Sequence, residues 1–236
     1  MKTDRWNIAQ KYEKNWWDSK KEGISTVFYK SFADTLTKDL TGILEIKNDT
    51  YVLEIGSGAA GTITYVESEH KYAIDPLEYY YSTVEEFTKD RDKKVKYYSA
   101  KGEDLPFNND MFDLVIIDNV LDHCSDPEKV LTEMKRVLKP GGILYFRQNT
   151  YHSWGVMVRT ILEKILFDKG HPFTFSKKHL EKLFTGFDLK VLKFSSNGYL
   201  ETWKKEFFSF RKKELAKAIL FATRDKTLYI LKNKSL

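Results

Sequence analysis

The stretch VLEIGSGAAG at residues 52–61 contains a glycine-rich turn in which Gly56, Gly58 and Gly61 have the spacing G-x-G-x-x-G. Glycine has no Cβ, so a turn of this composition lets a ligand approach the backbone closely. Dinucleotides use such turns because a helix N-terminus and free N–H groups attract their pyrophosphate. The glycines alone therefore indicate an adenosine-bearing ligand and leave its class open.

A carboxylate stands at the mouth of this turn. Glu54 lies two residues before Gly56, where its charge opposes a pyrophosphate and suits a cation. S-adenosylmethionine carries a sulfonium and an ammonium group and no phosphate, so Glu54 favours this methyl donor. The alternative is that the Glu54 side chain merely caps the following helix. Asp75, at the end of the second predicted strand, can accept hydrogen bonds from ribose hydroxyls in either class of ligand and does not separate the two.

Two further segments follow the glycine turn in order. They are YAIDP at residues 72–76 and GEDLPFNNDMFDLVIIDNVLDHCSDPEKVLTEMKRVLKPGGILYF at residues 102–146. With the glycine turn, they resemble the class I S-adenosylmethionine-dependent methyltransferases, particularly the branch of the ubiquinone-biosynthesis methyltransferases. That branch shares an L-P-F…F-D-x-V…R-V-L-K-P-G-G pattern, and the resemblance covers roughly residues 50 to 150.

The resemblance implies an α/β fold, a Rossmann-like three-layer sandwich whose seven-stranded, mostly parallel sheet has an antiparallel last strand. It places the methionine end of S-adenosylmethionine near the glycine turn, the ribose at Asp75, the adenine near Glu103 and the sulfonium near Asp118. The full cofactor-binding set that we predict is Glu54, Gly56, Ser57, Gly58, Asp75, Pro76, Gly102, Glu103, Asp118 and Asn119.

Two positions depart from the family pattern. The family often has glycine at position 60, where this chain has Ala60, and Gly61 is a candidate to supply the missing flexibility. The family commonly places Asp where Lys101 stands, to accept from the adenine amino group. Lysine has only donors, so we assign adenine recognition to Glu103 and the local backbone.

Three histidines are candidate catalytic bases for an acceptor that loses a proton. His123 follows the fourth predicted strand, whereas His152 and His171 lie in the region expected to cover the substrate. The alternative for His123 is a structural role. A metal-dependent reaction would need clustered oxygen ligands near Asp118, and Asp122 is the only obvious extra candidate, so we expect no metal.

The elements that must position these residues alternate between strand and helix from about residue 50, as a parallel sheet with crossover helices requires. The predicted strands are 50–55, 71–75, 95–100, 112–118, 141–148, 187–194 and 226–232. Helices are predicted at 60–69, 77–90, 126–141, 153–168 and 177–184, and one or two more within 200–224. In the third of these, Asp126 can cap the helix and Pro127 occupies its first position.

The domain prediction is a single methyltransferase domain over residues 1–236. Residues 1–45 form a helical attachment, in which Trp6, Tyr12, Trp16 and Trp17 either pack in the core or close a lid over the cofactor. Residues 50–150 form the cofactor-binding core. Residues 151–236 supply substrate-covering helices and a C-terminal strand pair, and the basic, aromatic segment 201–221 is a solvated helix, an anion grip or a peripheral membrane contact.

Composition limits the partners. A formal charge of +5 is small beside 39 basic and 34 acidic residues, so we expect no nucleic-acid partner. One cysteine suits a reducing compartment, and the charged N-terminal segment and the lack of a long apolar run favour a cytoplasmic protein. The sequence leaves the oligomeric state open.

Together these features predict an S-adenosylmethionine-dependent methyltransferase that acts on a small-molecule or a lipid- or sugar-linked acceptor. Two alternatives remain. One is an NAD-dependent oxidoreductase on a Rossmann fold, and the other is a catalytically inactive S-adenosylmethionine-binding module, which Lys101 makes conceivable.

Overall fold

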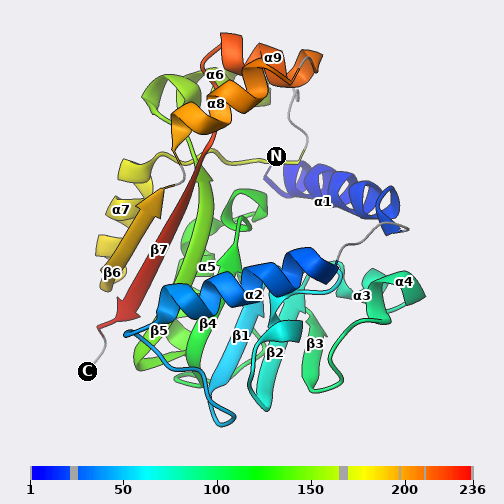
Figure 1. Cartoon of the computed structure of the whole chain (residues 1–236), viewed down its shortest axis with the longest axis vertical. Helices are drawn as coiled ribbons and strands as arrows, with labels where there is room; N and C mark the ends of the chain where they lie inside the picture. Colours follow the sequence, from blue (N-terminus) through cyan, green and yellow to red (C-terminus); the bar gives the residue numbers. More distant parts are fainter. Residues whose placement is uncertain (1, 22–25, 165–169, 197, 210, 235–236) are drawn as a thin grey trace.

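A seven-stranded sheet with the strand order β3-β2-β1-β4-β5-β7-β6 forms the centre of the molecule (Figure 1). This is a computed structural model, and it describes residues 2–21, 26–164, 170–196, 198–209 and 211–234. The strands are β1 (Tyr51–Ile55), β2 (His70–Asp75), β3 (Val95–Ser99), β4 (Phe112–Asp118), β5 (Leu138–Thr150), β6 (Leu189–Ser196) and β7 (Asp225–Asn233).

The pairing of the strands confirms the predicted sheet. β1 pairs in parallel with β2 and β4, β2 with β3, and β4 with β5. β7 runs antiparallel to both β5 and β6. Because the first five strands are parallel, the loops after β1, β2 and β4 all lie at one edge of the sheet, where open α/β sheets bind their ligands.

Helices cover both faces and one end of this sheet. They are α1 (Lys2–Asp18), α2 (Thr26–Leu40), α3 (Glu78–Tyr81), α4 (Glu85–Thr88), α5 (Pro127–Val137), α6 (Ser153–Lys164), α7 (Lys177–Gly186), α8 (Tyr199–Phe207) and α9 (Lys212–Ile219). Figure 1 places α6, α8 and α9 beyond the end of β5, on the side where α1 also lies. Within the described segments, no helix has the length and apolar character that a membrane span needs.

Each face of the sheet has its own core. Leu114 and Ile116 of β4 pack with Leu36 of α2, whereas the alternate residues Val115 and Ile117 belong to the core that contains α5 and α7. A strand buried on both faces must be apolar at successive positions. This requirement explains the apolar run LVII in the sequence. The helix α2 covers one of the two faces of this strand.

The helix predicted at 60–69 is wrong, because only a single 3₁₀ turn, η2 (Thr62–Tyr65), connects β1 and β2. The carboxylate of Glu54 accepts the N–H groups of Thr62 and Ile63, and Lys71 Nζ donates to the carbonyl of Val66 at 3.0 Å. These side-chain bonds compete with helical hydrogen bonds. Ile63 packs in the same core as α2, so the short turn still covers the sheet.

Other predicted helices differ only in extent. The helix predicted at 77–90 is divided into α3 and α4. The helix predicted at 126–141 is α5, in which Asp126 accepts from the N–H of Lys129 at 3.2 Å, as the capping pattern predicts. The helix predicted at 153–168 is α6 as far as Lys164, and residues 165–168 lie outside the described part.

Candidate active site

A cavity of about 490 Å³ opens at the carboxyl ends of β1, β2 and β4, with α1 and α2 forming part of its wall. The residues predicted to bind the cofactor come from separate loops, and the parallel sheet brings them together. All of them line this cavity: Glu54, Gly56, Ser57, Gly58, Asp75, Pro76, Gly102, Glu103, Asp118 and Asn119.

The glycine turn is shaped by close contacts. Gly58 has φ +59°, and a Cβ at this position would lie 2.6 Å from the ring of Trp17. Gly61 has φ +74°, and a Cβ there would lie 2.7 Å from the carboxylate of Glu54. A side chain at either position would be strained and would displace a neighbour. Gly61 therefore makes room for Glu54, beside the family position that Ala60 occupies.

Glu54 faces the cavity and also ends the glycine turn. Its carboxylate is 4% exposed and accepts hydrogen bonds from the N–H groups of Thr62 at 3.2 Å and Ile63 at 2.9 Å. Burial raises the pKa of Glu54 to about 7, while these two hydrogen bonds act in the opposite direction. The capping role and the cavity-lining role thus occur in one side chain.

Asp75 and Asp118 are the next two cavity carboxylates. Asp75 accepts from the N–H of Gly58 at 3.0 Å and of Leu77 at 2.8 Å, which ties the glycine turn to the end of β2. Burial raises the pKa of Asp75 to about 7. Burial also raises the pKa of Asp118, although Arg147 lies 3.4 Å from its carboxylate.

Glu103 and Lys101 have different surroundings. One oxygen of Glu103 accepts from the N–H and the hydroxyl of Ser125, at 2.6 and 2.8 Å, and from the N–H of Asp126 at 3.1 Å. Glu103 therefore fixes the loop before α5 as well as lining the cavity. Lys101 is exposed, and its ammonium lies 3.8 Å from the ring centroid of Trp6 in α1.

The helix α1 forms both a wall of the cavity and part of the core. Trp17 is 8% exposed and packs edge-on against Tyr81 and Phe87, at ring-centroid distances of 5.6 and 5.9 Å. Its indole N–H donates to Glu13 at 3.1 Å, and both residues line the cavity. The sequence left core packing and cavity cover as alternatives, and α1 has features of both.

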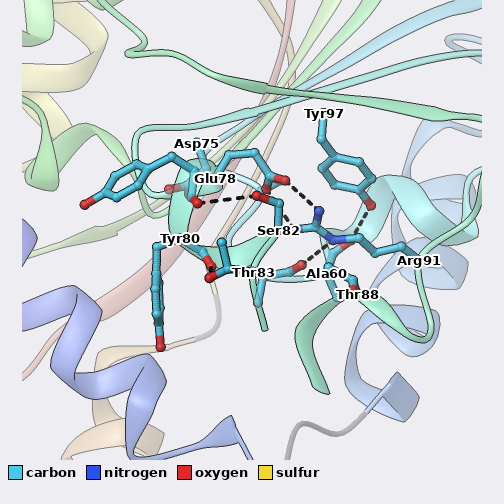
Figure 2. A network of polar contacts seen from close by, with 12 residues as sticks. Ala60, Asp75, Glu78, Tyr80, Ser82, Thr83, Thr88, Arg91 and Tyr97 are labelled. Carbon is cyan, nitrogen blue, oxygen red and sulfur yellow. Dashed lines mark hydrogen bonds and ion pairs between the residues drawn. The ribbon is translucent and has the colours of Figure 1, made fainter. Parts of the chain in front are cut away.

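A buried ion pair behind the glycine turn was not recognised from the sequence. Arg91 and Glu78 form a bidentate pair at 2.7 and 2.8 Å, and the guanidinium also donates to the carbonyl of Ala59 at 2.7 Å. Figure 2 shows this pair beside Tyr97, whose hydroxyl donates to the carbonyl of Ala60 at 2.9 Å. These side chains hold the loop carbonyls in place, and neither their types nor their spacing signals that role.

The three candidate catalytic histidines fall into two groups. His123 and His171 line the large cavity, and their ring centroids are 4.5 Å apart. His152 lines a separate cavity of about 340 Å³, where its ring lies 5.1 Å from that of Tyr199. Of the three, His123 and His171 are therefore placed to act on a molecule in the large cavity.

The charges around the large cavity suit a cation. Among the described lining residues, five carry carboxylates and Arg224 carries the one guanidinium. The five are Glu13, Glu54, Asp75, Glu103 and Asp118. For Glu54, Asp75 and Asp118 burial raises the pKa, because desolvation disfavours the ionised form. A ligand with sulfonium and ammonium groups would supply a compensating positive charge, whereas a pyrophosphate would add to the repulsion.

The fold resembles that of solved methyltransferase structures, and comparisons of the sequence with known proteins point to the same class. Residues 53–146 match the model of a family described as a methyltransferase domain. The matched segment contains the glycine turn and the strands β2, β3 and β4.

Two curated relatives carry different methyltransferase activities. A sarcosine/dimethylglycine N-methyltransferase of Halorhodospira halochloris is 33% identical over 105 residues, covering 42% of this chain and 37% of the relative. A ubiquinone/menaquinone biosynthesis C-methyltransferase of Vibrio vulnificus is 48% identical over 50 residues, covering 21% of this chain and 19% of the relative. The chain spans less than half the length of the curated relatives it matches.

One similar solved structure is a geranyl diphosphate C-methyltransferase from Streptomyces coelicolor in complex with Mg²⁺, geranyl diphosphate and S-adenosyl-L-homocysteine. It aligns with a TM-score of 0.62 over 85% of this chain and 79% of that chain, at 13% identity. A likeness at this identity shows the fold and does not define the acceptor.

Proposed function

We propose that this chain transfers a methyl group from S-adenosylmethionine to a small-molecule or a lipid- or sugar-linked acceptor. The observation that carries the proposal is the ring of five carboxylates around a glycine-lined cavity of about 490 Å³. A cation gains from such a ring in a partly desolvated cavity. We infer that residues 1–236 act as one unit, with 1–45 covering the cofactor-binding core at 50–150 and 151–236 covering the acceptor.

The roles of the cofactor-binding residues follow from their places in the cavity. We propose that Glu54 and the glycine turn hold the methionine end and that Asp75 accepts from the ribose. Gly102 and Glu103 would contact the adenine, and Asp118 and Asn119 would lie on the sulfonium side. S-adenosylmethionine supplies a methyl group already activated by sulfonium, so the displacement needs no covalent enzyme intermediate.

The chain then has to align the acceptor with the methyl–sulfur bond. The bond from the acceptor to the methyl carbon forms while the carbon–sulfur bond breaks, and the electron pair of that bond stays on sulfur. An oxygen or amine acceptor also loses a proton. His123 and His171 are the histidines that line the cavity, so we propose that they act on the acceptor nucleophile.

The two alternatives make different predictions about ligands and turnover. An NAD-dependent oxidoreductase would have to seat a pyrophosphate beside Glu54 and Asp75, whose charges oppose it. An inactive binding module would bind S-adenosylmethionine without turnover. Transfer of a labelled methyl group into a cell extract tests the second alternative and identifies the acceptor. We expect one labelled product, and binding of S-adenosylmethionine with no labelled product would favour the inactive module.

We further propose that α8 and α9 rest on a membrane surface when the acceptor is lipid-linked. Large apolar side chains project from this pair, including Leu200 at 68% and Phe208 at 65% exposure. Lys204 and Lys205 lie on α8 beside them. An apolar face with adjacent cations suits an anionic bilayer. Co-sedimentation with phosphatidylserine vesicles should be salt-sensitive and should weaken in Phe208→Ser, and the absence of such binding would remove the membrane role.

A further inference from the structure

Three donor atoms converge at the wall of the large cavity. Asp122, His123 and His171 each place one potential ligand atom within 4.8 Å of the other two. Both imidazoles line the cavity, and Asp122 stands next to them. In the sequence, Asp122 is the only obvious extra oxygen ligand near Asp118, and His171 belongs to a distant segment.

The separations within this cluster are too long for hydrogen bonds. His123 Nε2 lies 3.9 Å from Asp122 Oδ1, and His171 Nε2 lies 4.0 Å from Asp122 Oδ2. Hydrogen bonds of this type span about 2.7–3.2 Å. Metal–nitrogen and metal–oxygen bonds of about 2.0–2.2 Å place two donors on one ion about 3.0–3.6 Å apart at tetrahedral or cis-octahedral angles, and up to about 4.4 Å apart when they lie opposite each other. The separations of 3.9 and 4.0 Å are therefore longer than a direct hydrogen bond, and a shift of the side chains by less than about 1 Å would bring the donors onto one ion.

One oxygen of the buried Asp122 carboxylate lacks the hydrogen bond that a buried polar atom normally makes. The Asp122 side chain is 7% exposed, and Oδ1 has no hydrogen-bond partner among the described residues. Leaving a buried carboxylate oxygen unpaired is costly, so buried carboxylates are normally paired or coordinate metals. In contrast, Glu54, a buried carboxylate that lines the cavity, has two backbone donors.

The local backbone holds the donors together. Asn119 has φ +55° and turns the chain after β4, and η3 (Leu121–His123) follows with the N–H of His123 donating to the carbonyl of Val120 at 2.9 Å. The N–H of Phe173 donates to the backbone carbonyl of Asp122 at 3.3 Å. This contact anchors the segment of His171 directly against η3.

We propose that Asp122, His123 and His171 form a binding site for one divalent transition-metal ion, such as Fe²⁺, Co²⁺, Mn²⁺ or Zn²⁺. Two imidazoles and one carboxylate are a donor set for these ions and leave coordination positions open toward the cavity. An ion here would polarise the acceptor nucleophile and lower its pKa. This role rests on the proposed methyl transfer and gives both histidines the function of ligands rather than free bases.

Titration of the metal-stripped full-length protein with Co²⁺, followed by visible absorption, tests the site without any methyl transfer. Zn²⁺ calorimetry gives a second measurement. We expect one ion per chain, with affinity reduced about 100-fold or more in His171→Ala and in Asp122→Asn, because each removes a direct ligand and even outer-shell changes cost about 10–100-fold. His179→Ala, at an exposed histidine of α7, is the matched control and should bind like the wild type.

Circular dichroism and S-adenosylmethionine affinity establish that each variant is folded. The site is refuted if the wild type binds neither ion, or if His171→Ala and His179→Ala bind equally. Because the titration needs neither cofactor nor acceptor, a failure of metal binding leaves the proposed methyl transfer untouched. Conversely, metal binding by a protein that transfers no methyl group would support the site and not the activity.

Discussion

Carboxylates in two parts of the site differ in their hydrogen-bond partners. At the glycine turn, Glu54 and Asp75 each accept two backbone N–H groups, from Thr62 and Ile63 and from Gly58 and Leu77. Beside His123 and His171, which line the same cavity, Asp122 has one oxygen with no hydrogen-bond partner in the described part of the chain, and a nitrogen of each imidazole lies about 4 Å from its carboxylate.

The carboxylates at the glycine turn are held in position for a ligand, whereas the donor set around Asp122 is incomplete. Backbone donors fix the positions of the Glu54 and Asp75 carboxylates. These carboxylates are therefore already positioned, and a ligand has only to supply a positive charge. Asp122 Oδ1, in contrast, has no hydrogen-bond donor among the described residues. The glycine turn therefore suits an organic cation, and the cluster of Asp122, His123 and His171 suits a small ion that several side chains can share.

The largest effect is expected when the charge at the glycine turn is removed. Glu54→Gln preserves the size of the side chain but loses the negative charge that faces the ligand, so S-adenosylmethionine should bind about 100-fold more weakly, or roughly 2.7 kcal/mol. Isothermal calorimetry measures the change. Glu45→Gln, at an exposed glutamate, is the matched control, and equal losses in the two variants would remove Glu54 from the site.

The pH dependence of binding sharpens the same comparison. Glu54 and Asp75 both have pKa values of about 7 because of burial, so lowering the pH from 8 to 6 protonates them and should weaken S-adenosylmethionine binding about tenfold or more. Binding should release protons near pH 7, which calorimetry in two buffers of different ionisation enthalpy detects. Affinity that is flat over this range would contradict the charge argument.

The stability of the ligand-free protein should depend on pH in the opposite direction and should fall as the pH rises. The folded-state pKa of each carboxylate is raised above its unfolded value, so the stability it contributes is complete below about pH 4 and is lost as the pH rises through 7. As the pH rises from about 4 to 7, the melting temperature of Glu54→Gln should therefore fall less than that of the wild type.

The convergence of the predicted residues on one cavity was predictable because of how parallel strands are built. Glu54, Asp75 and Asp118 each lie at the end of an apolar run, and the carboxyl ends of adjacent parallel strands meet at one edge. The antiparallel last strand was implied by the resemblance to the class I methyltransferases, whereas the strand order β3-β2-β1-β4-β5-β7-β6 was not predicted. Local patterns alone predicted the strands themselves and the residues at their ends.

Contacts between distant segments were not predictable. The absence of a helix at 60–69 depends on Glu54 and Lys71 taking up backbone groups that a helix would use. Likewise, Arg91 reaches Glu78 and the loop carbonyl of Ala59, and His171 meets Asp122, only through the tertiary fold. Side chains with such roles carry no local periodicity that a sequence pattern could reveal.

A smaller effect is expected at the wall formed by α1. Trp17 touches the glycine turn at Gly58 and packs with Tyr81, so Trp17→Ala should loosen α1 and weaken S-adenosylmethionine binding about tenfold. Trp154 of α6, which is 52% exposed and is not among the residues that line the large cavity, is the matched control. If Trp17→Ala and Trp154→Ala both have the same affinity as the wild type, α1 does not close the ligand site.

The smallest effect is expected at Lys101. Its ammonium lies over Trp6, and a contact of this kind contributes about 0.5–1 kcal/mol at an exposed position. Lys101→Ala should therefore change S-adenosylmethionine affinity by no more than about fivefold. A loss as large as that of Glu54→Gln in the same calorimetric assay would mean that Lys101 contacts the ligand directly.

The most direct measurement is a side-by-side calorimetric titration of the wild-type protein with S-adenosylmethionine, S-adenosylhomocysteine and NAD at pH 8. A cavity ringed by carboxylates should bind the first two at one site per chain and give no heat with NAD. Saturable binding of NAD, with neither sulfur compound bound, would contradict the account.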